Sequence, residues 1–297
     1  MGAGERARKR RRGGGGRRFP APRGAVLAAA GALAPGGGAA TARGQLAGGL
    51  VWLAVGEAAY GALYLACLGR PAPLQWPAPP EARGVRLAPE EAFLLAHELG
   101  CLEVVDEKGG DSPMGSAQLW AALRTSNPRF PIVYTAFRHF LAKGWFVRSG
   151  LSYGVDYVLY RGHPETVHAE YAVSVQSLPP EGLAAAQVAA AVTTIDKGSR
   201  GGSTFADWVQ VQALVRLCGQ VGKQVVVFHS RISTRDDGGG GEDGGERAKG
   251  RNGESGGVAG DVGDAWAVPT CLERVEVREV LVGRWAPESG KAPEAPS

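Results

Sequence analysis

Residues Lys143 to Tyr171 read KGWFVRSGLSYGVDYVLYRGHPETVHAEY, and this segment has the most informative structural pattern in the chain. Glycines divide it into short runs in which apolar and polar residues alternate, which is the period-two pattern of β-strands. We expect strands at 145–149, 155–161 and 171–178. Tyr160 ends the second run, and His168 follows eight residues later, just before the third. A connection of that length joins neighbouring strand ends, so Tyr160 and His168 are expected to lie close together.

Patterns typical of helices flank this stretch on both sides. Before it, apolar residues at helical spacing predict helices over 88–100, from Ser116 onward and over 132–143. After it, the residues from Trp208 to Cys218 predict a helix that Gly222 ends. An apolar run at 225–228 and an alternating run at 272–285 predict two more strands. The fold class is therefore α/β (α+β), with a small helical N-terminal lobe and a C-terminal lobe on a mixed sheet.

Residues 46–68 form an apolar run of 23 residues, which is long enough to span a bilayer. Glu57 near its centre and several glycines disfavour that interpretation. We expect instead a short strand over 49–53 that leads into a buried helix over 57–67, and no membrane contact.

Glycine supplies 46 of the 297 residues, about twice the usual ~7 %. Fourteen of these glycines lie in 1–49 and twelve in 236–264. The same two patches carry most of the net charge, because 1–23 contributes +8 and 236–264 contributes −5 to a total of +4. The rest of the chain is close to neutral, which argues against a folded domain whose whole surface is basic.

These shifts of composition divide the chain. We expect a disordered basic tail at 1–43, an N-terminal lobe at 44–130 with a proline-rich linker at 71–86, and a C-terminal domain at 131–288. Low-complexity insertions are expected at 181–203 and 236–264, and a polar tail at 289–297.

The tail and the cysteines bear on the compartment. The cluster RARKRRR at 6–12 is typical of a nuclear localisation signal, although the Arg/Ala-rich composition of 1–43 leaves an organellar transit peptide open. The four cysteines form no C-x-x-C pair, which disfavours a zinc ribbon or a disulfide scaffold and fits a reducing compartment. We therefore expect the protein in the nucleus.

Tyr160, His168 and Lys223 are the candidate catalytic residues. RNA cleavage without a metal needs a base for the 2′-hydroxyl, an acid for the departing 5′-oxygen and a cation for the charge on phosphorus. Histidine titrates near neutral pH and lysine is a point charge suited to phosphate, whereas tyrosine is a poor base unless cations such as Lys223 lower its pKa. Each residue alone is also compatible with a structural role, as a packing tyrosine, a turn histidine or a solvated lysine.

A family resemblance strengthens the enzymatic interpretation. The segments YTAFRHFLAKGW (134–145) and SGLSYGVDYVLYRGHPETVHAEYAVSV (149–175) resemble the catalytic domain of the tRNA-splicing endonuclease family. LAPEEAFLLAHELGCLEV at 87–104 is similar to its N-terminal lobe. ALVRLCGQVGKQVVVF at 213–228 and VEVREVLVGRWAPE at 275–288 are similar to its helix-to-strand element and its closing strand.

The resemblance implies a restriction-endonuclease-like catalytic domain that needs neither metal nor cofactor. It makes Tyr160 the general base, His168 the general acid and Lys223 the cation, while Arg216 and Trp285 clamp a flipped base of the substrate. The substrate is an intron-containing pre-tRNA, and the motifs YGVDYVLYR and RWAPE look like those of the subunit that cuts the 5′ splice site. The products are a 2′,3′-cyclic phosphate and a 5′-hydroxyl. The partners are a second catalytic subunit and two structural subunits in a heterotetramer.

Alternatives remain open at this point. Between His168 and Lys223 lie 54 residues, so Lys197 in DKGSRGGS competes for the role of the cation. A noncatalytic assembly subunit of the same complex is a second possibility, but it predicts a broken triad. A noncatalytic RNA-binding module is a third, and it predicts a basic folded surface.

Overall fold

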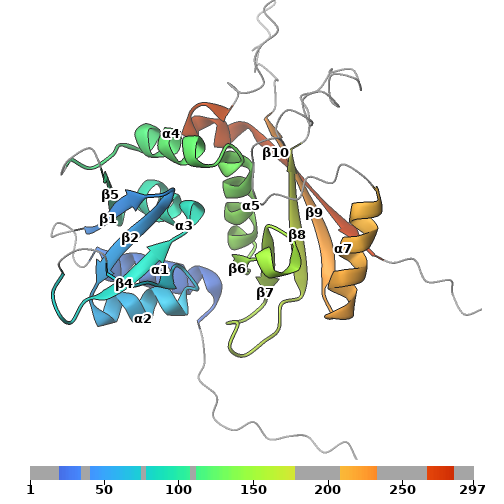
Figure 1. Ribbon diagram of the computed structural model, residues 1–297, viewed down its shortest axis with the longest axis horizontal. Helices are drawn as coiled ribbons and strands as arrows, with labels where there is room; N and C mark the ends of the chain where they lie inside the picture. The colour runs from blue at the N-terminus through green and yellow to red at the C-terminus, as the bar shows by residue number, and fades with distance from the viewer. Residues whose placement is uncertain are drawn as a thin grey trace, which may run out of the picture.

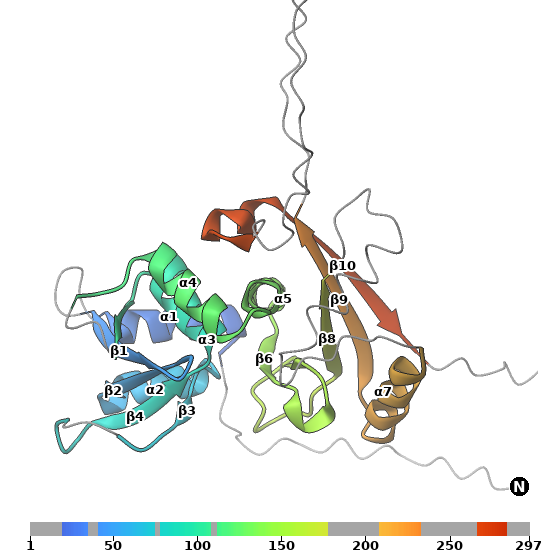
Figure 2. The same ribbon diagram turned by 45° about the horizontal axis from the view of Figure 1, so that its top comes forward.

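The computed structural model describes residues 20–34, 41–74, 78–107, 112–177, 208–232 and 266–283. They form two lobes, each with a five-stranded mixed sheet, and the long helix α5 lies between the two sheets (Figures 1 and 2). The expected α+β class is confirmed. The expected insertions at 181–203 and 236–264, the basic cluster at 6–12 and the tail at 289–297 lie outside the described residues.

The N-terminal lobe is a sheet with strand order β3-β4-β2-β1-β5, in which only β1 and β5 run parallel. Its strands are β1 (Ala42–Ala47), β2 (Leu50–Val55), β3 (Arg70–Pro71), β4 (Arg83–Leu87) and β5 (Leu102–Asp106). Its helices are α1 (Pro22–Leu33), α2 (Glu57–Leu65), α3 (Pro89–Phe93), the π-helical turn η1 (Leu94–Glu98) and α4 (Ser116–Ser126). The sequence patterns had indicated helices and only one strand in this lobe, so the sheet is larger than expected.

Helix α1 corrects the expectation of disorder over the whole of 1–43. Pro22 occupies the first turn, where its missing N–H costs nothing, and alanine has the highest helix propensity. Ala25, Val26, Ala29 and Leu33 share one buried face, which packs in the core beside α2. An Ala/Gly-rich composition therefore concealed an amphipathic helix.

The expected linker at 71–86 is also corrected at both ends, because Pro71 belongs to β3 and residues 83–86 belong to β4. The apolar run at 46–68 folds as β2 and α2, as expected. No helix in the described ranges is long and apolar enough to cross a membrane.

The C-terminal lobe is a sheet with strand order β10-β9-β8-β7-β6, in which β8 and β9 are parallel and the other neighbours antiparallel. Its strands are β6 (Phe146–Ser149), β7 (Tyr157–Tyr160), β8 (Tyr171–Ser177), β9 (Gln224–Ile232) and β10 (Val275–Val282). Its helices are α5 (Phe130–Ala142), η2 (Leu151–Tyr153), α7 (Trp208–Gln220) and η4 (Pro269–Arg274). These are the helices and strands that the sequence patterns predicted here, apart from the short 3₁₀ turns.

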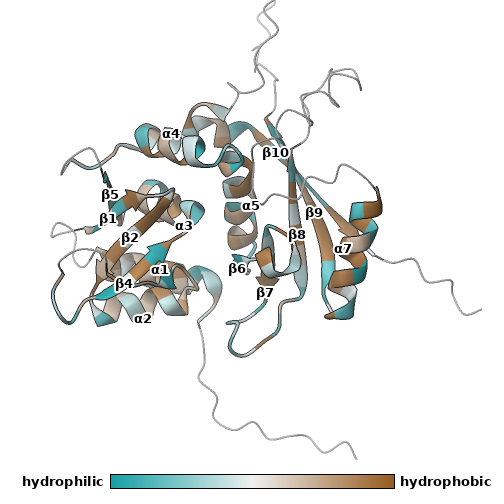
Figure 3. Cartoon of the chain, in the orientation of Figure 1, coloured by the Kyte–Doolittle hydropathy of each residue, from teal (hydrophilic) through white to brown (hydrophobic). Residues whose placement is uncertain are grey.

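Two helices cover the two faces of this sheet. Val173 and Val175 of β8 pack in the core that contains α5, whereas Ala172 points to the smaller core under α7. Much of β9 and of α5 is hydrophobic, whereas β10 also carries hydrophilic residues (Figure 3). Gly144 at φ +84° ends α5 in the left-handed region and turns the chain into β6.

Helix α5 also joins the lobes. Tyr134 of α5 lies edge-on to Phe93 of α3 with ring centroids 5.0 Å apart, and Phe140 approaches Phe228 of β9 at 5.5 Å. Both lobes therefore share one continuous hydrophobic core.

Candidate active site

The three candidate catalytic residues lie at the same end of the C-terminal sheet. Leu159, Tyr171 and Gln224 are aligned across β7, β8 and β9. Tyr160 follows Leu159 and Lys223 precedes Gln224, so both extend beyond that aligned row. Two strand spacings separate β7 from β9, or roughly 10 Å between backbones. Long side chains from these two positions can therefore reach the same phosphate group.

Tyr160 is the last residue of β7 and pairs with Phe146 of β6. Its ring is half-buried and packs against both hydrophobic clusters. Packing therefore fixes this ring at the end of β7.

His168 is exposed and lies in the connection between β7 and β8. The residue after it, Ala169, is buried under α7. Glu170 then donates its N–H to the carbonyl of Leu159 at 2.9 Å and accepts the N–H of Gln224 at 3.0 Å. The backbone beside His168 is therefore held between β7 and β9 while the imidazole is free to meet a substrate.

Lys223 lies at the junction of α7 and β9. Gly222 at φ +67° ends the helix, and the N–H of Lys223 donates to the carbonyl of Cys218 at 2.9 Å. The Lys223 ammonium lies 4.5 Å from the centroid of the Tyr153 ring, a cation–π contact. Its competitor Lys197 lies outside the described residues.

The electrostatics of Tyr160 differ from the expectation. Burial raises the pKa of Tyr160 above its ordinary value, and the neighbouring phenol of Tyr153 adds to the increase. The cations that lower this pKa are Arg148 and Arg70, not Lys223, whose ammonium is held by Tyr153. Tyr160 is therefore protonated at neutral pH in the free protein, and arginines at the lobe junction favour its ionised form.

Arg216 and Lys223 share a hollow. A cavity of about 830 Å³ lies between the end of α7, the start of β9 and the end of β10, and both cations line it. Arg216 is exposed on α7, so its guanidinium is available to stack on a base. Trp285, the other expected clamp residue, lies outside the described residues.

A contact between the lobes holds the loop that carries His168. The Nε2 atom of His163 lies 3.3 Å from the carbonyl oxygen of Tyr64 at the end of α2, and the two rings are 5.2 Å apart. The Tyr64 hydroxyl donates to the carboxylate of Glu165. His163 is only 3 % exposed, and its carbonyl accepts the N–H of Thr166 at 2.8 Å. We call His163, Glu165 and Tyr64 the loop anchor; sequence reasoning missed it because its parts are about a hundred residues apart.

A buried ion pair lies behind the site and was also missed. Arg129 Nη1 donates to Asp156 Oδ1 at 2.9 Å, and both side chains are at most 6 % exposed. Asp156 Oδ2 accepts the N–H of Val175 at 2.7 Å, and Arg129 Nη2 donates to the Val175 carbonyl at 2.8 Å. The pair thereby connects the start of α5, the turn before β7 and the middle of β8. Its only signal in the sequence is a single acid, Asp156, between the apolar residues 155 and 157.

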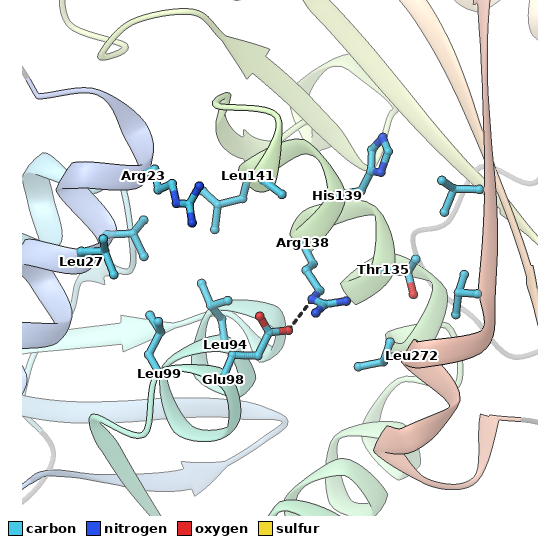
Figure 4. A pocket seen from close by; sticks show the side chains of 14 residues that line it. Arg23, Leu27, Leu94, Glu98, Leu99, Thr135, Arg138, His139, Leu141 and Leu272 are labelled. Carbon is cyan, nitrogen blue, oxygen red and sulfur yellow. Dashed lines mark ion pairs between the residues drawn. The ribbon is translucent and has the colours of Figure 1, made fainter.

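Another hollow of about 600 Å³ lies between α1, η1, α5 and the start of β10 (Figure 4). Its walls are largely aliphatic, and Arg138 and Glu98 form an ion pair at 2.6 Å within it. Tyr160, His168 and Lys223 do not line this hollow. The candidate chemistry therefore belongs to the end of the sheet and not to this cavity.

Comparison with known proteins identifies the domain. The family model described as tRNA intron endonuclease, catalytic C-terminal domain, matches residues 130–235. That range contains α5, β6 to β9 and all three candidate catalytic residues.

Curated relatives of the chain are subunits of tRNA-splicing endonucleases, in agreement with the family model. The chain is 30 % identical over 230 residues to tRNA-splicing endonuclease subunit Sen2-1 of Arabidopsis thaliana, covering 77 % of this chain and 74 % of that protein. It is 30 % identical to the probable tRNA-splicing endonuclease subunit Sen2 of Oryza sativa subsp. japonica over 67 % of this chain, and 28 % identical to Sen2 of Mus musculus over 68 %. It spans only 53 % of the rice protein and 34 % of the mouse protein. The chain therefore belongs to the tRNA-splicing endonuclease family, and it carries the catalytic C-terminal domain of a tRNA intron endonuclease.

Proposed function

We propose that this chain is the catalytic subunit that cuts pre-tRNA at the 5′ exon–intron junction by metal-independent transesterification. The observation that carries the proposal is the common position of Tyr160 and Lys223 at one end of the sheet, with the loop of His168 between β7 and β8. The choice of the 5′ junction rests on the motifs YGVDYVLYR and RWAPE and on the similarity to Sen2 subunits.

In the proposed reaction, Tyr160 first loses its own proton to solvent, and Arg148 and Arg70 favour the phenolate that results. This phenolate takes the proton of the 2′-hydroxyl as the 2′-oxygen attacks phosphorus. The bond from phosphorus to the 5′-oxygen breaks, and protonated His168 gives its proton to that oxygen. Lys223 stabilises the extra negative charge on the phosphoryl oxygens. The products are a 2′,3′-cyclic phosphate and a 5′-hydroxyl, so atoms and charge balance without a cofactor.

The proposed assembly is a heterotetramer with a second catalytic subunit and two structural subunits, located in the nucleus. The names of the relatives, which call them subunits, support an assembly of several chains. The basic cluster at 6–12 supports the nuclear location. Arg216 and Trp285 are proposed to clamp a flipped base of the substrate.

The test is cleavage of an intron-containing pre-tRNA by the reconstituted complex in the presence of EDTA. We expect a cut at the 5′ junction that leaves a 2′,3′-cyclic phosphate and a 5′-hydroxyl. Enzymatic phosphorylation distinguishes the two ends, because the 5′-hydroxyl accepts a phosphate and the cyclic phosphate does not. A cut only at the 3′ junction contradicts the proposed specificity. A 3′-hydroxyl with a 5′-phosphate contradicts the mechanism.

The identity of the catalytic lysine can be decided by two parallel variants. We expect Lys223→Ala to lower kcat about 10²–10³-fold, the usual loss when one stabilising group is removed from a charged transition state. Lys197→Ala is the matched control and should change kcat less than twofold. Single-turnover cleavage of the 5′ junction measures both variants. A large loss in Lys197→Ala with little change in Lys223→Ala would assign the catalytic cation to Lys197.

The loop anchor gives a further prediction. Tyr64→Phe removes the hydroxyl that donates to Glu165 but keeps the ring beside His163. We expect kcat to fall about tenfold with little change of KM, because a misplaced acid affects the chemical step more than binding. Tyr60→Phe on the same helix is the matched control, since Tyr60 packs against the core and under Arg83 and is not part of the loop anchor. Equal activity of both variants would show that the anchor does not position His168.

A further inference from the structure

Three arginines from the two lobes meet in a small cavity at the lobe junction. Arg70 of β3, Arg86 of β4 and Arg148 of β6 line a hollow of about 270 Å³. The start of α3, Leu50 of β2, Phe137 of α5 and Tyr157 of β7 also line it. This cavity is separate from the hollow lined by Arg216 and Lys223.

No carboxylate of the described residues forms an ion pair with these three arginines. Arg70 and Arg86 are directly opposite each other in the antiparallel register of β3 and β4, where like charges destabilise a sheet. Arg148 donates to the carbonyl of Cys67 at 2.7 Å, and the Arg86 guanidinium lies 5.8 Å from the Trp52 ring centroid.

The two acids in the cavity are occupied by other donors. The Glu91 carboxylate accepts the N–H of Ala88 at 2.8 Å and that of Gly69 at 3.0 Å, and Glu90 accepts the hydroxyl of Tyr157 at 2.9 Å. Burial raises the pKa of Glu91 to about 7, so its negative charge is only partly present at neutral pH. The cavity therefore keeps a net positive charge, which favours the binding of an anion.

The cavity adjoins the proposed site of cleavage. Arg148 pairs with Val158, and Phe146 pairs with Tyr160, so Arg148 and Tyr160 are diagonal neighbours on β6 and β7. Diagonal neighbours of this kind lie about 7–8 Å apart. An anion held by the three arginines would lie on the side of Tyr160 that faces the N-terminal lobe.

We propose that Arg70, Arg86 and Arg148 form an RNA phosphate subsite, which binds a backbone phosphate close to the one that is cut. Guanidinium groups suit this ligand because each can donate two parallel hydrogen bonds to a phosphate. The inference rests on the proposed function, since it takes the bound RNA to be the pre-tRNA.

The test is equilibrium binding of a fluorescently labelled pre-tRNA, with a 2′-deoxy substitution that blocks cutting, to the reconstituted complex over a range of salt concentrations. For Arg70→Ala with Arg86→Ala, we expect Kd to rise about tenfold or more. We expect the slope of log K against log salt to flatten by about 1 for each arginine removed. Replacing both by lysine should keep the slope. The matched control is Arg83→Ala on the same strand, because Arg83 is exposed and already paired with Glu57 at 2.9 Å.

An unchanged Kd and slope in the double alanine variant would overturn the inference, as would a loss of thermal stability with no change of slope. If the double variant fails to fold, the single variant Arg70→Gln at the exposed strand position is tested instead. Its slope of log K against log salt should flatten by about 1. The two proposals can fail separately. If the wild-type complex does not cut the unblocked RNA but the slopes change as expected, the proposed function fails and the subsite stands.

Discussion

Replacing His168 by alanine is expected to lower kcat for cleavage at the 5′ junction about 10²–10⁴-fold, the range that a general acid contributes. His168 is exposed and its neighbour Ala169 keeps the loop attached to the core under α7. The fold should therefore be unaffected, with a change in the free energy of unfolding within about 0.5 kcal/mol. Single-turnover cleavage and thermal unfolding of the same preparation measure both effects.

The leaving group offers a sharper form of this experiment. A thiol has a pKa near 8.5, far below that of an alcohol, so a substrate with sulfur in place of the 5′-oxygen needs little help from an acid. We expect His168→Ala to cut this substrate at nearly the wild-type rate. His97→Ala is the matched control, because His97 is also exposed but lies on η1 in the N-terminal lobe and bonds to Ser116. Slow cutting of both substrates by His168→Ala would assign His168 to another step.

Much of the C-terminal lobe was predictable because its elements obey strong local rules. The period-two runs around Tyr160, the apolar strand after Lys223 and the glycines that end α5 and α7 each specify their structure within a few residues. The N-terminal strands were missed for the opposite reason. β1 reads ARGQLA and β4 reads RGVRL, and glycine and arginine obscure the alternation that the pairing with β2 imposes.

Some residues of the candidate site were also predictable from local sequence, whereas others depend on tertiary packing. Tyr160 and His168 follow from spacing along one hairpin, whereas Lys223 was assigned by family resemblance and is placed by the parallel pairing of β8 and β9. The contact of His163 with Tyr64 depends on how two lobes pack, which no local pattern encodes. The same is true of Arg70 and Arg148, which come from different lobes.

Asp156→Ala is expected to be the most destabilising single change in the C-terminal lobe, by about 3–5 kcal/mol. It would leave the guanidinium of Arg129 buried without its partner and the N–H of Val175 without an acceptor. Asp156→Asn should cost less, because the amide keeps an oxygen for one of the two donors. Chemical denaturation of the full chain measures these differences, with Glu103→Ala as the control: its partner Arg43 is 3.6 Å away and both are exposed, so the cost should be within about 1 kcal/mol.

The double variant Arg129→Met with Asp156→Ala distinguishes the buried charge from the lost hydrogen bonds. If the cost of Asp156→Ala arises chiefly from an unpaired guanidinium, removing that guanidinium recovers a part of it, and the double variant is more stable than Asp156→Ala alone. The backbone groups of Val175 still lack their partners, so recovery should be incomplete.

Because the pair also fixes the turn before β7, the double variant should retain a folded lobe but place Tyr160 less accurately, with kcat reduced and KM little changed. The outcome that contradicts this recovery is additivity, in which the double variant loses as much free energy of unfolding as Asp156→Ala and Arg129→Met lose together. The hydrogen bonds to β8, and not the buried charge, would then dominate this connection.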